Sequence, residues 1–346
     1  MVVKTWREAA TLILAVKSSA NAYKLLMLQR SAASKFMPNA YVFPGGVKSE
    51  ADFEPAWHTL LKERNQHNEK YDRIINTIKD KPLQHGLSSE IGYRLCALRE
   101  TFEESGILIT NDESGKEIVI SNPNEHIGGA YSTLQEWRKN VYENPDNFFK
   151  MFHSLKLSPG IGNLIEWSSW LTPSFDRYRF DTMFYLCCCE TSHDGLMTED
   201  LHDKKELTRT VWASPKEIVN DHIGFLFPPQ LLETQRMKWY PTIEELMTFA
   251  LEREKEGIGM WCPHKTILKD GFIVTYPGDD HHNYDEIAPS SELKDTTIEE
   301  IRQQATNLNR YELNTKTKRV DIQQNTDWYG HKHLGHVNVG EMTMLN

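Results

Sequence analysis

The stretch Arg99-Glu-Thr-Phe-Glu-Glu-Ser-Gly106 decides the predicted fold. It closes a helix that we expect to begin near Ser88 or Ser89, which are good N-caps, and to stop at Gly106, which suits a left-handed helix end. At about 100° per residue, four apolar side chains share one narrow face of this helix and are predicted to enter the core: Ile91, Leu95, Leu98 and Phe102. The opposite face carries Glu100, Glu103 and Glu104, called the glutamate trio below.

The glutamate trio has the spacing of a metal site. Carboxylates at positions i, i+3 and i+4 of a helix repel one another unless cations lie among them. Magnesium is a hard cation that prefers oxygen ligands and would turn this repulsion into a site. The alternative is a solvated acidic face, which is common on helices. The complete string, together with the preceding turn Phe43-Pro-Gly-Gly46 that lets backbone approach a ligand, favours the metal site.

These residues resemble the signature of the Nudix hydrolase family, G-x5-E-x7-R-E-U-x-E-E-x-G-U, in which U is a bulky apolar residue. The matching positions are Gly46, Arg99, Glu100, Phe102, Glu103, Glu104, Gly106 and Ile107. The resemblance implies an α/β (α+β) fold with a mixed sheet sandwiched between helices. It also implies that the glutamate trio binds divalent metal and that Arg99 orients Glu100.

The chain departs from the family signature in two places. Ile91 stands where the first signature Glu is expected, and the signature loop carries an insertion at about 49–87. Because this insertion is polar, charged and without a sustained apolar stripe, we expect a partly helical segment on the surface.

A second resemblance bears on the substrate. Coenzyme A diphosphatases of the same family carry L-L-T-x-R-S-x3-R-x3-G-x3-F-P-G-G before the signature. The stretch Leu26-Met-Leu-Gln-Arg-Ser31 and the Phe43-Pro-Gly-Gly46 turn keep this spacing, and Leu28, Lys35 and Asn39 replace the Thr, Arg and Gly. Further segments between about residues 5 and 280 include Trp170-Leu-Thr-Pro173, Arg179-Phe-Asp-Thr182 and Trp212-Ala-Ser-Pro215. With the glycine turn and the insertion, they resemble the animal peroxisomal branch known as nucleoside diphosphate-linked moiety X motif 19. That branch is associated with hydrolysis of coenzyme A and its acyl esters.

Candidate substrate-binding residues lie near the glycine turn and beyond the signature helix. Arg30, Lys35 and Arg179 could bind phosphate, since basic groups suit phosphate oxygens; an ordinary surface role is the alternative for each. The backbone of Gly45 and Gly46 would face the substrate. Glu206 is a candidate ligand for metal or water, or else a solvated loop carboxylate.

The predicted reaction is magnesium-dependent hydrolysis of a diphosphate linkage, with manganese as a possible substitute. The metal would activate a water molecule, and either Glu100 or Glu206 would accept its proton. With coenzyme A, the products would be adenosine 3′,5′-bisphosphate and 4′-phosphopantetheine or its acylated form. The alternatives are hydrolysis of ADP-ribose, NADH or a nucleotide sugar, and a noncatalytic module that binds a metabolite.

Composition limits the partners. The net charge of −10 argues against binding to a nucleic-acid backbone, and the apolar run 9–16 is too short to cross a bilayer. The odd number of cysteines, 5, and the adjacent Cys187, Cys188 and Cys189 argue against disulfides. We expect this cysteine run to lie in a buried strand rather than at a metal or redox site. The partner is therefore a small molecule, while the oligomeric state is not readable.

The remaining expectations concern organisation. We expect strands over 9–16, 23–28, 107–110, 164–172 and 180–189, and helices over 131–156, 214–219 and 244–256. A Nudix domain is predicted over 5–285 and a polar C-terminal extension over 286–346. His331, His333 and His336 are expected at the surface, and Trp167 and Trp170 in the core rather than on an adenine ring. The resemblance points to peroxisomes, but the end Met344-Leu-Asn346 lacks a small-basic-Leu signal, so the cytosol is the alternative.

Overall fold

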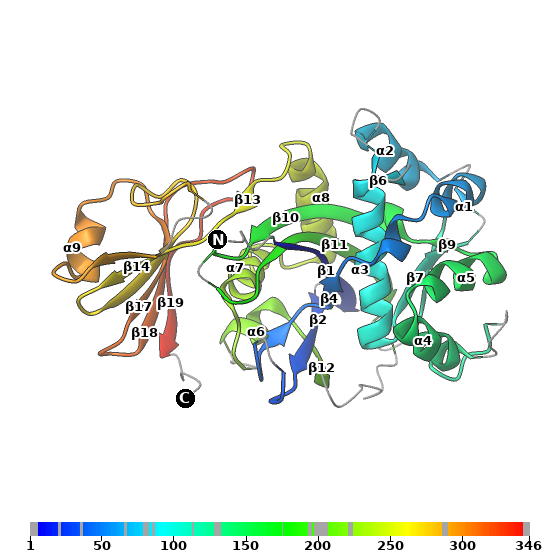
Figure 1. The fold of residues 1–346 in the computed structure, drawn as a ribbon, viewed down its shortest axis with the longest axis horizontal. Helices are drawn as coiled ribbons and strands as arrows, with labels where there is room; N and C mark the ends of the chain where they lie inside the picture. Colours follow the sequence, from blue (N-terminus) through cyan, green and yellow to red (C-terminus); the bar gives the residue numbers. More distant parts are fainter. Residues whose placement is uncertain are drawn as a thin grey trace.

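The computed structural model describes residues 6–19, 22–34, 37–65, 68–78, 83–84, 87–112, 114–127, 133–174, 176–192, 196, 207–220, 224–285 and 290–341. A mixed sheet with helices around it forms the larger part of the molecule, and a second sheet lies at one end (Figure 1). Among the described residues, the helices are all too short or too polar to cross a bilayer.

The central sheet has eight strands and both parallel and antiparallel pairs. Its order is β12-β2-β1-β11-β10-β13, with β3 added to β2 and β4 to β1. The strands are β1 (Arg7–Ser19), β2 (Ala22–Arg30), β3 (Tyr41–Val42), β4 (Gly45–Val47), β10 (Leu164–Leu171), β11 (Phe180–Ser192), β12 (Leu207–Ala213) and β13 (Met260–Trp261). The strands expected over 9–16 and 23–28 are present in β1 and β2, which pair antiparallel, and the parallel pair of β1 and β11 makes the sheet mixed.

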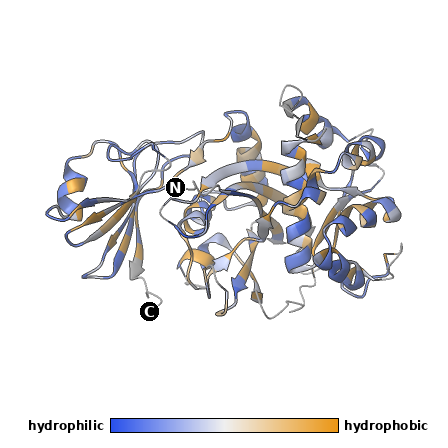
Figure 2. Cartoon of the chain, viewed as in Figure 1, coloured by the Kyte–Doolittle hydropathy of each residue, from blue (hydrophilic) through white to orange (hydrophobic). Residues whose placement is uncertain are grey.

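Side chains of β1 point alternately to the two faces of the central sheet, and each face packs into its own hydrophobic core. Leu12 and Leu14 face the core that also contains Leu98 of the signature helix, α3 (Ser89–Ser105). Ile13 and Ala15 face the opposite core, which α7 (Pro228–Met237) and α8 (Ile243–Glu254) cover. Figure 2 shows hydrophobic residues gathered along the central strands between the more hydrophilic helices. The sheet therefore lies between helices, as predicted.

The insertion in the signature loop belongs to the core, which corrects the expected surface segment. Its described elements are η1 (Glu50–Phe53), α1 (Ala56–Arg64), α2 (Glu69–Ile78), β5 (Leu83–Gln84) and β6 (Leu87–Ser88). Trp57, Leu60 and Leu61 of α1 are buried in the same core as α3. Trp57 packs edge-on against Phe149, with ring centroids 5.0 Å apart. These side chains make a single helical turn of apolar surface, too short to stand out as a stripe in the sequence.

A layer of short elements completes the region beside α3. It contains β7 (Leu108–Asn111), β8 (Glu117–Ile120), α4 (Leu134–Glu143), α5 (Asp146–Leu155), β9 (Ser158–Pro159) and η2 (Ile161–Asn163). The single helix expected over 131–156 is wrong, because the chain breaks at Asn144 and restarts after Pro145. Proline cannot donate the backbone hydrogen bond that a continuous helix requires. The helix expected at 214–219 is α6 (Pro215–Asn220).

The polar C-terminal residues also fold into a sheet. Its order is β16-β14-β15-β17-β18-β19, with α9 (Ile298–Gln303) beside it. The strands are β14 (His264–Leu268), β15 (Gly271–Thr275), β16 (Ser291–Leu293), β17 (Asn309–Asn314), β18 (Arg319–Gln324) and β19 (Gly335–Glu341). The expected domain boundary at residue 285 therefore falls inside this sheet.

An aromatic cluster and one histidine join the two sheets. Trp170 stacks on Trp261 with ring centroids 5.4 Å apart, and Tyr276 packs edge-on against both rings. His331 is 3% exposed, and its Nε2 lies 3.0 Å from the carbonyl oxygen of Trp167. Burial lowers the pKa of His331 to about 3, so the ring is neutral at pH 7. The expected surface position is wrong for His331.

The other aromatic and histidine predictions hold. The indole Nε1 atoms of Trp167 and Trp170 each donate to the buried carboxylate of Glu233, at 2.8 Å, which confirms that both rings lie in the core. His333 and His336 are exposed at the surface, as expected.

Candidate active site

Helix α3 positions the predicted catalytic face. All four members of its predicted apolar stripe are buried, and Gly106 ends the helix with a left-handed φ of 76°. The glutamate trio lies on the side turned away from this stripe and is only partly buried. Packing of the stripe against the sheet therefore fixes the direction in which the carboxylates point.

Arg99 holds two members of the glutamate trio together. Its Nη1 atom donates to Glu100 Oε1 at 2.8 Å and to Glu103 Oε1 at 2.9 Å. The guanidinium is almost wholly buried, with 3% of its side chain exposed. A buried guanidinium between two carboxylates limits both their charge repulsion and their movement.

Asp52 completes this network, and the sequence analysis did not identify it. Its Oδ1 and Oδ2 accept from Arg99 Nε at 2.7 Å and Nη2 at 2.9 Å. Asp52 lies in η1, where its carboxylate also accepts from the Ser49 backbone N–H as part of a capping box. The spacing of Ser49 and Asp52 carries the capping signal, but nothing local in the sequence reveals the pairing with Arg99.

The glycine turn contacts the same helix. Gly45 N–H donates to Glu104 Oε2 at 2.9 Å. A Cβ added to Gly46 would come within 2.4 Å of Glu100 Oε2, and one added to Gly45 within 2.5 Å of the Ala10 carbonyl oxygen. Glycine is thus a steric requirement at position 45, where the neighbour is the backbone of β1, whereas a side chain at position 46 would displace the Glu100 carboxylate.

The electrostatics of the glutamate trio suit the binding of a cation. Burial, together with the charge of Glu100, raises the pKa of Glu103 to about 7 and that of Glu104 to about 8. Arg99 lowers the pKa of Glu103 but does not offset these effects. Partly buried carboxylates with raised pKa values are a donor set that a divalent cation would neutralise. The residues present therefore fit a hard metal ion.

Arg138 is a second residue that the sequence analysis missed. From α4, its Nε donates to the Glu103 carbonyl oxygen and its Nη2 to that of Glu104, both at 2.9 Å. These are carbonyls of the last turn of α3, which have no partner within the helix. Arg138 thereby ties the C-terminal turn of α3 to the neighbouring layer, and no helical pattern within α3 could indicate it.

The predicted substrate-binding residues are only partly brought together. Arg30, at the end of β2, bonds Ser34 Oγ through Nε and Nη2, and its charge lowers the pKa of Glu104, so it lies near the trio. Arg179 lies over the Trp6 ring at 5.5 Å, beside Arg7 on β1. Lys35 and Glu206 lie outside the described residues.

Comparisons with known proteins agree with this geometry. A family model for the NUDT19 Nudix domain matches residues 6–237. The chain is 34% identical over 320 residues to acyl-coenzyme A diphosphatase NUDT19 of Xenopus laevis, covering 80% of this chain and 81% of that protein. It is 30% identical over 305 residues to the protein of the same name from Homo sapiens, covering 80% of each.

The fold is also found among solved structures. The crystal structure of a NUDIX hydrolase from Alicyclobacillus acidocaldarius matches with a TM-score of 0.53 and 20% sequence identity. The match covers 71% of this chain and 97% of that one. At this identity the likeness concerns the arrangement of elements and not the substrate.

Proposed function

Because this chain belongs to the NUDT19 branch of the Nudix hydrolase family, we propose that it hydrolyses the diphosphate linkage of coenzyme A or acyl-coenzyme A. The chain is a Nudix hydrolase. The arrangement of the glutamate trio, held by Arg99 and by the Gly45 N–H, is the observation that carries the proposal. The names of the relatives support coenzyme A derivatives as the substrate class.

Nudix hydrolases generally use divalent metal ions, and we propose magnesium here, with manganese as a substitute. The glutamate trio would hold the metal, with help from the Gly46 carbonyl oxygen. When bound, such an ion polarises phosphoryl oxygens and lowers the pKa of a water ligand. This chemistry suits hydrolysis of a diphosphate at neutral pH.

The protein's own groups have separate roles in this proposal. Arg99 keeps Glu100 and Glu103 in place, and the Gly45 N–H fixes one oxygen of Glu104, so the carboxylates are oriented before substrate binds. Glu100 or Glu206 accepts the proton of the attacking water. Arg30, and with it Lys35 and Arg179, would bind substrate phosphates through charge-assisted hydrogen bonds.

Water adds to one phosphorus and the bridging oxygen leaves with the other. Coenzyme A then gives adenosine 3′,5′-bisphosphate and 4′-phosphopantetheine, and acyl-coenzyme A gives the acylated phosphopantetheine. The substrate is a small molecule, and we expect neither nucleic acid nor membrane as a partner. Peroxisomal residence is proposed from the same branch and is tested by imaging the full chain in animal cells.

A substrate panel tests the proposed activity. The purified chain with Mg²⁺ is assayed on coenzyme A, an acyl-coenzyme A, ADP-ribose and NADH, and the products are identified by mass. We expect coenzyme A and its acyl ester to give the highest kcat/KM and the two predicted products. Glu104→Gln, assayed in parallel, controls for contaminating hydrolases. A higher kcat/KM on ADP-ribose or NADH would assign the chain to a different diphosphate.

A further inference from the structure

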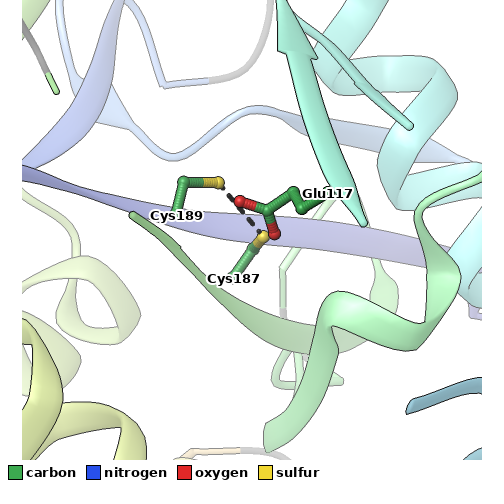
Figure 3. Close-up of side chains that lie close together, drawn as sticks. All are labelled: Glu117, Cys187 and Cys189. Atoms are coloured by element: carbon green, nitrogen blue, oxygen red, sulfur yellow. Dashed lines mark hydrogen bonds between the residues drawn. The ribbon is translucent and has the colours of Figure 1, made fainter. Parts of the chain in front are cut away.

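A second set of metal-binding side chains lies away from the signature helix. Cys187 and Cys189 of β11 point to the same side, with their Sγ atoms 3.6 Å apart, and Glu117 of β8 faces both (Figure 3). One ligand atom from each residue lies within 4.8 Å of the others. We call Glu117, Cys187 and Cys189 the dithiol cluster. The strand is buried as predicted, but its thiols meet a carboxylate, which ordinary core packing does not require.

We propose that the dithiol cluster is a site for a thiophilic divalent cation of the zinc class. Zinc–thiolate bonds of about 2.3 Å in a tetrahedron separate two sulfurs by roughly 3.8 Å, close to the 3.6 Å found here. A carboxylate oxygen is an accepted third zinc ligand, and water would complete the tetrahedron. Magnesium is excluded by the same donors, because it prefers oxygen ligands in an octahedron.

A disulfide is the competing use of two neighbouring thiols, and the strand opposes it. Cys187 pairs in register with Leu14 of β1 and Leu164 of β10, and Cys189 pairs with Val16. Two residues of an extended strand separate the Cα atoms by about 6.6 Å, at the upper limit for a disulfide. Closing the S–S bond would therefore distort a central strand, whereas binding a metal leaves the sulfurs where they are.

Metal binding at this site exchanges protons for the cation. The hydrogen bond with Cys187 and burial raise the pKa of Cys189, and the charge of Glu117 adds to this effect. When a divalent cation binds, the two thiols lose one proton each, and the two thiolates and the carboxylate bind the cation as a complex with one net negative charge. No electrons are transferred.

The site would join two layers of the fold. Glu117 belongs to the small sheet of β7, β8 and β9, whereas both cysteines belong to the central sheet. Along β1, the cysteines pair with Leu14 and Val16, and the catalytic glycines pair with Thr11 and Ala10. The proposed metal is therefore a structural tie that is separate from the glutamate trio.

Cobalt absorption tests this proposal without interference from the glutamate trio. Co²⁺ bound by thiolates gives a ligand-to-metal charge-transfer band, which carboxylates do not give. We expect the reduced, metal-free chain in saturating Mg²⁺ to develop this band at one Co²⁺ per chain. Added Zn²⁺ should abolish the band, release about two protons per chain and raise the unfolding temperature.

Single substitutions test which side chains of the dithiol cluster bind the metal. Cys187→Ala and Cys189→Ala should lose the band, and Glu117→Gln should keep the fold and weaken binding by roughly tenfold or more. Cys188→Ala is the matched control, because Cys188 lies between the two ligands but packs on the opposite core. It should bind cobalt like the parent.

Three results would overturn the proposal. The first is a parent chain that gives no charge-transfer band, and the second is a band that survives replacement of both Cys187 and Cys189. The third is a Cys188→Ala variant that binds cobalt as weakly as Cys187→Ala and Cys189→Ala. If the alanine variants fold poorly, Glu117→Gln decides, because its side chain is partly exposed and keeps its shape. Unchanged cobalt affinity in Glu117→Gln would remove the carboxylate from the site.

Discussion

Strand β1 lies beside two groups of metal-binding side chains, the glutamate trio and the dithiol cluster. The two groups differ in how the chain accommodates their acidic side chains when no metal is bound. Near its start, Ala10 and Thr11 pair with the glycine turn that contacts the glutamate trio. Further along, Leu14 and Val16 pair with the cysteines of the dithiol cluster. The first set contains oxygen ligands only, and the second contains two sulfurs and one carboxylate.

The difference shows what each ligand type needs when no metal is bound. The glutamate trio brings three acidic groups close together, and the buried guanidinium of Arg99 supplies positive charge to two of them, Glu100 and Glu103. A buried thiol is neutral when protonated, so the two cysteines of the dithiol cluster need no counterion. Four substitutions or conditions test whether this contrast holds.

Replacing Asp52 should have the largest effect. Asp52→Ala removes both acceptors of Arg99 Nε and Nη2 and leaves a buried guanidinium with fewer partners. We expect the free energy of unfolding to fall by about 3 kcal/mol, measured by urea denaturation. Asp52→Asn keeps the shape and one acceptor oxygen, and should lose less. Unchanged stability in Asp52→Ala would mean that the trio does not depend on a fully paired Arg99.

Glu104→Gln should come next in size. It keeps the hydrogen bond from the Gly45 N–H possible but removes a charge from the glutamate trio, so kcat should fall by about 10²-fold or more. The same variant should keep the cobalt–thiolate band of the dithiol cluster. Normal turnover at saturating Mg²⁺ would show that Glu104 has no part in the mechanism. Loss of the cobalt–thiolate band would show that the dithiol cluster depends on the glutamate trio.

Arg30→Ala tests the substrate side of the glutamate trio. If Arg30 binds the 3′-phosphate, its loss should raise the KM for coenzyme A by roughly ten- to hundredfold, the value of one charge-assisted contact. Coenzyme A that lacks the 3′-phosphate should be affected much less. An equal loss on both substrates, with a lower unfolding temperature, would indicate that Arg30 is a structural partner of Ser34 and of nearby carboxylates.

The smallest expected effect is a pH dependence of stability. Glu103 and Glu104 have pKa values of about 7 and 8 in the folded chain, against 4.5 ordinarily. Between these values the folded chain binds more protons than the unfolded chain, so the metal-free protein should lose stability as pH rises from about 5 to 8.

Saturating Mg²⁺ should reverse this slope, because the cation competes with the protons. The difference between the parent chain and Glu104→Gln isolates the contribution of that group from the rest of the protein. Thermal unfolding at several pH values measures both. A metal-free parent chain that becomes more stable than Glu104→Gln as pH rises would contradict the raised pKa of Glu104.

The features that could be predicted from the sequence are local. The apolar stripe of α3, the opposing trio and the glycine end all follow from the repeat of one helix, and the cysteine run follows from its apolar neighbours. Asp52 and Arg138 could not be found this way, because their contacts with α3 join residues 47 and 35 positions apart. Such contacts depend on tertiary packing.

Two local errors had different causes. The prediction of one helix over 131–156 took no account of Pro145, although a proline inside a helix breaks it and this residue is visible in the sequence. The lack of a fourth zinc ligand in a terminal segment favours a surface position for His331, but the docking of the C-terminal sheet buries its ring against Trp167. Burial that comes from packing between two sheets leaves no periodic pattern in a short terminal segment.

The stacked rings of Trp170 and Trp261 give the molecule an optical reporter. The two indoles lie nearly parallel, with an interplanar angle of 17°, and Tyr276 of the C-terminal region packs against both. Two identical chromophores at this separation couple as an exciton pair, so their circular dichroism depends on mutual orientation. Both indoles belong to the central sheet, so undocking of the C-terminal sheet would remove Tyr276 from their surroundings and leave the stacked pair in place. The near-ultraviolet spectrum should then change while the backbone signal of the central sheet persists, so contact between the two sheets can be followed without an added label.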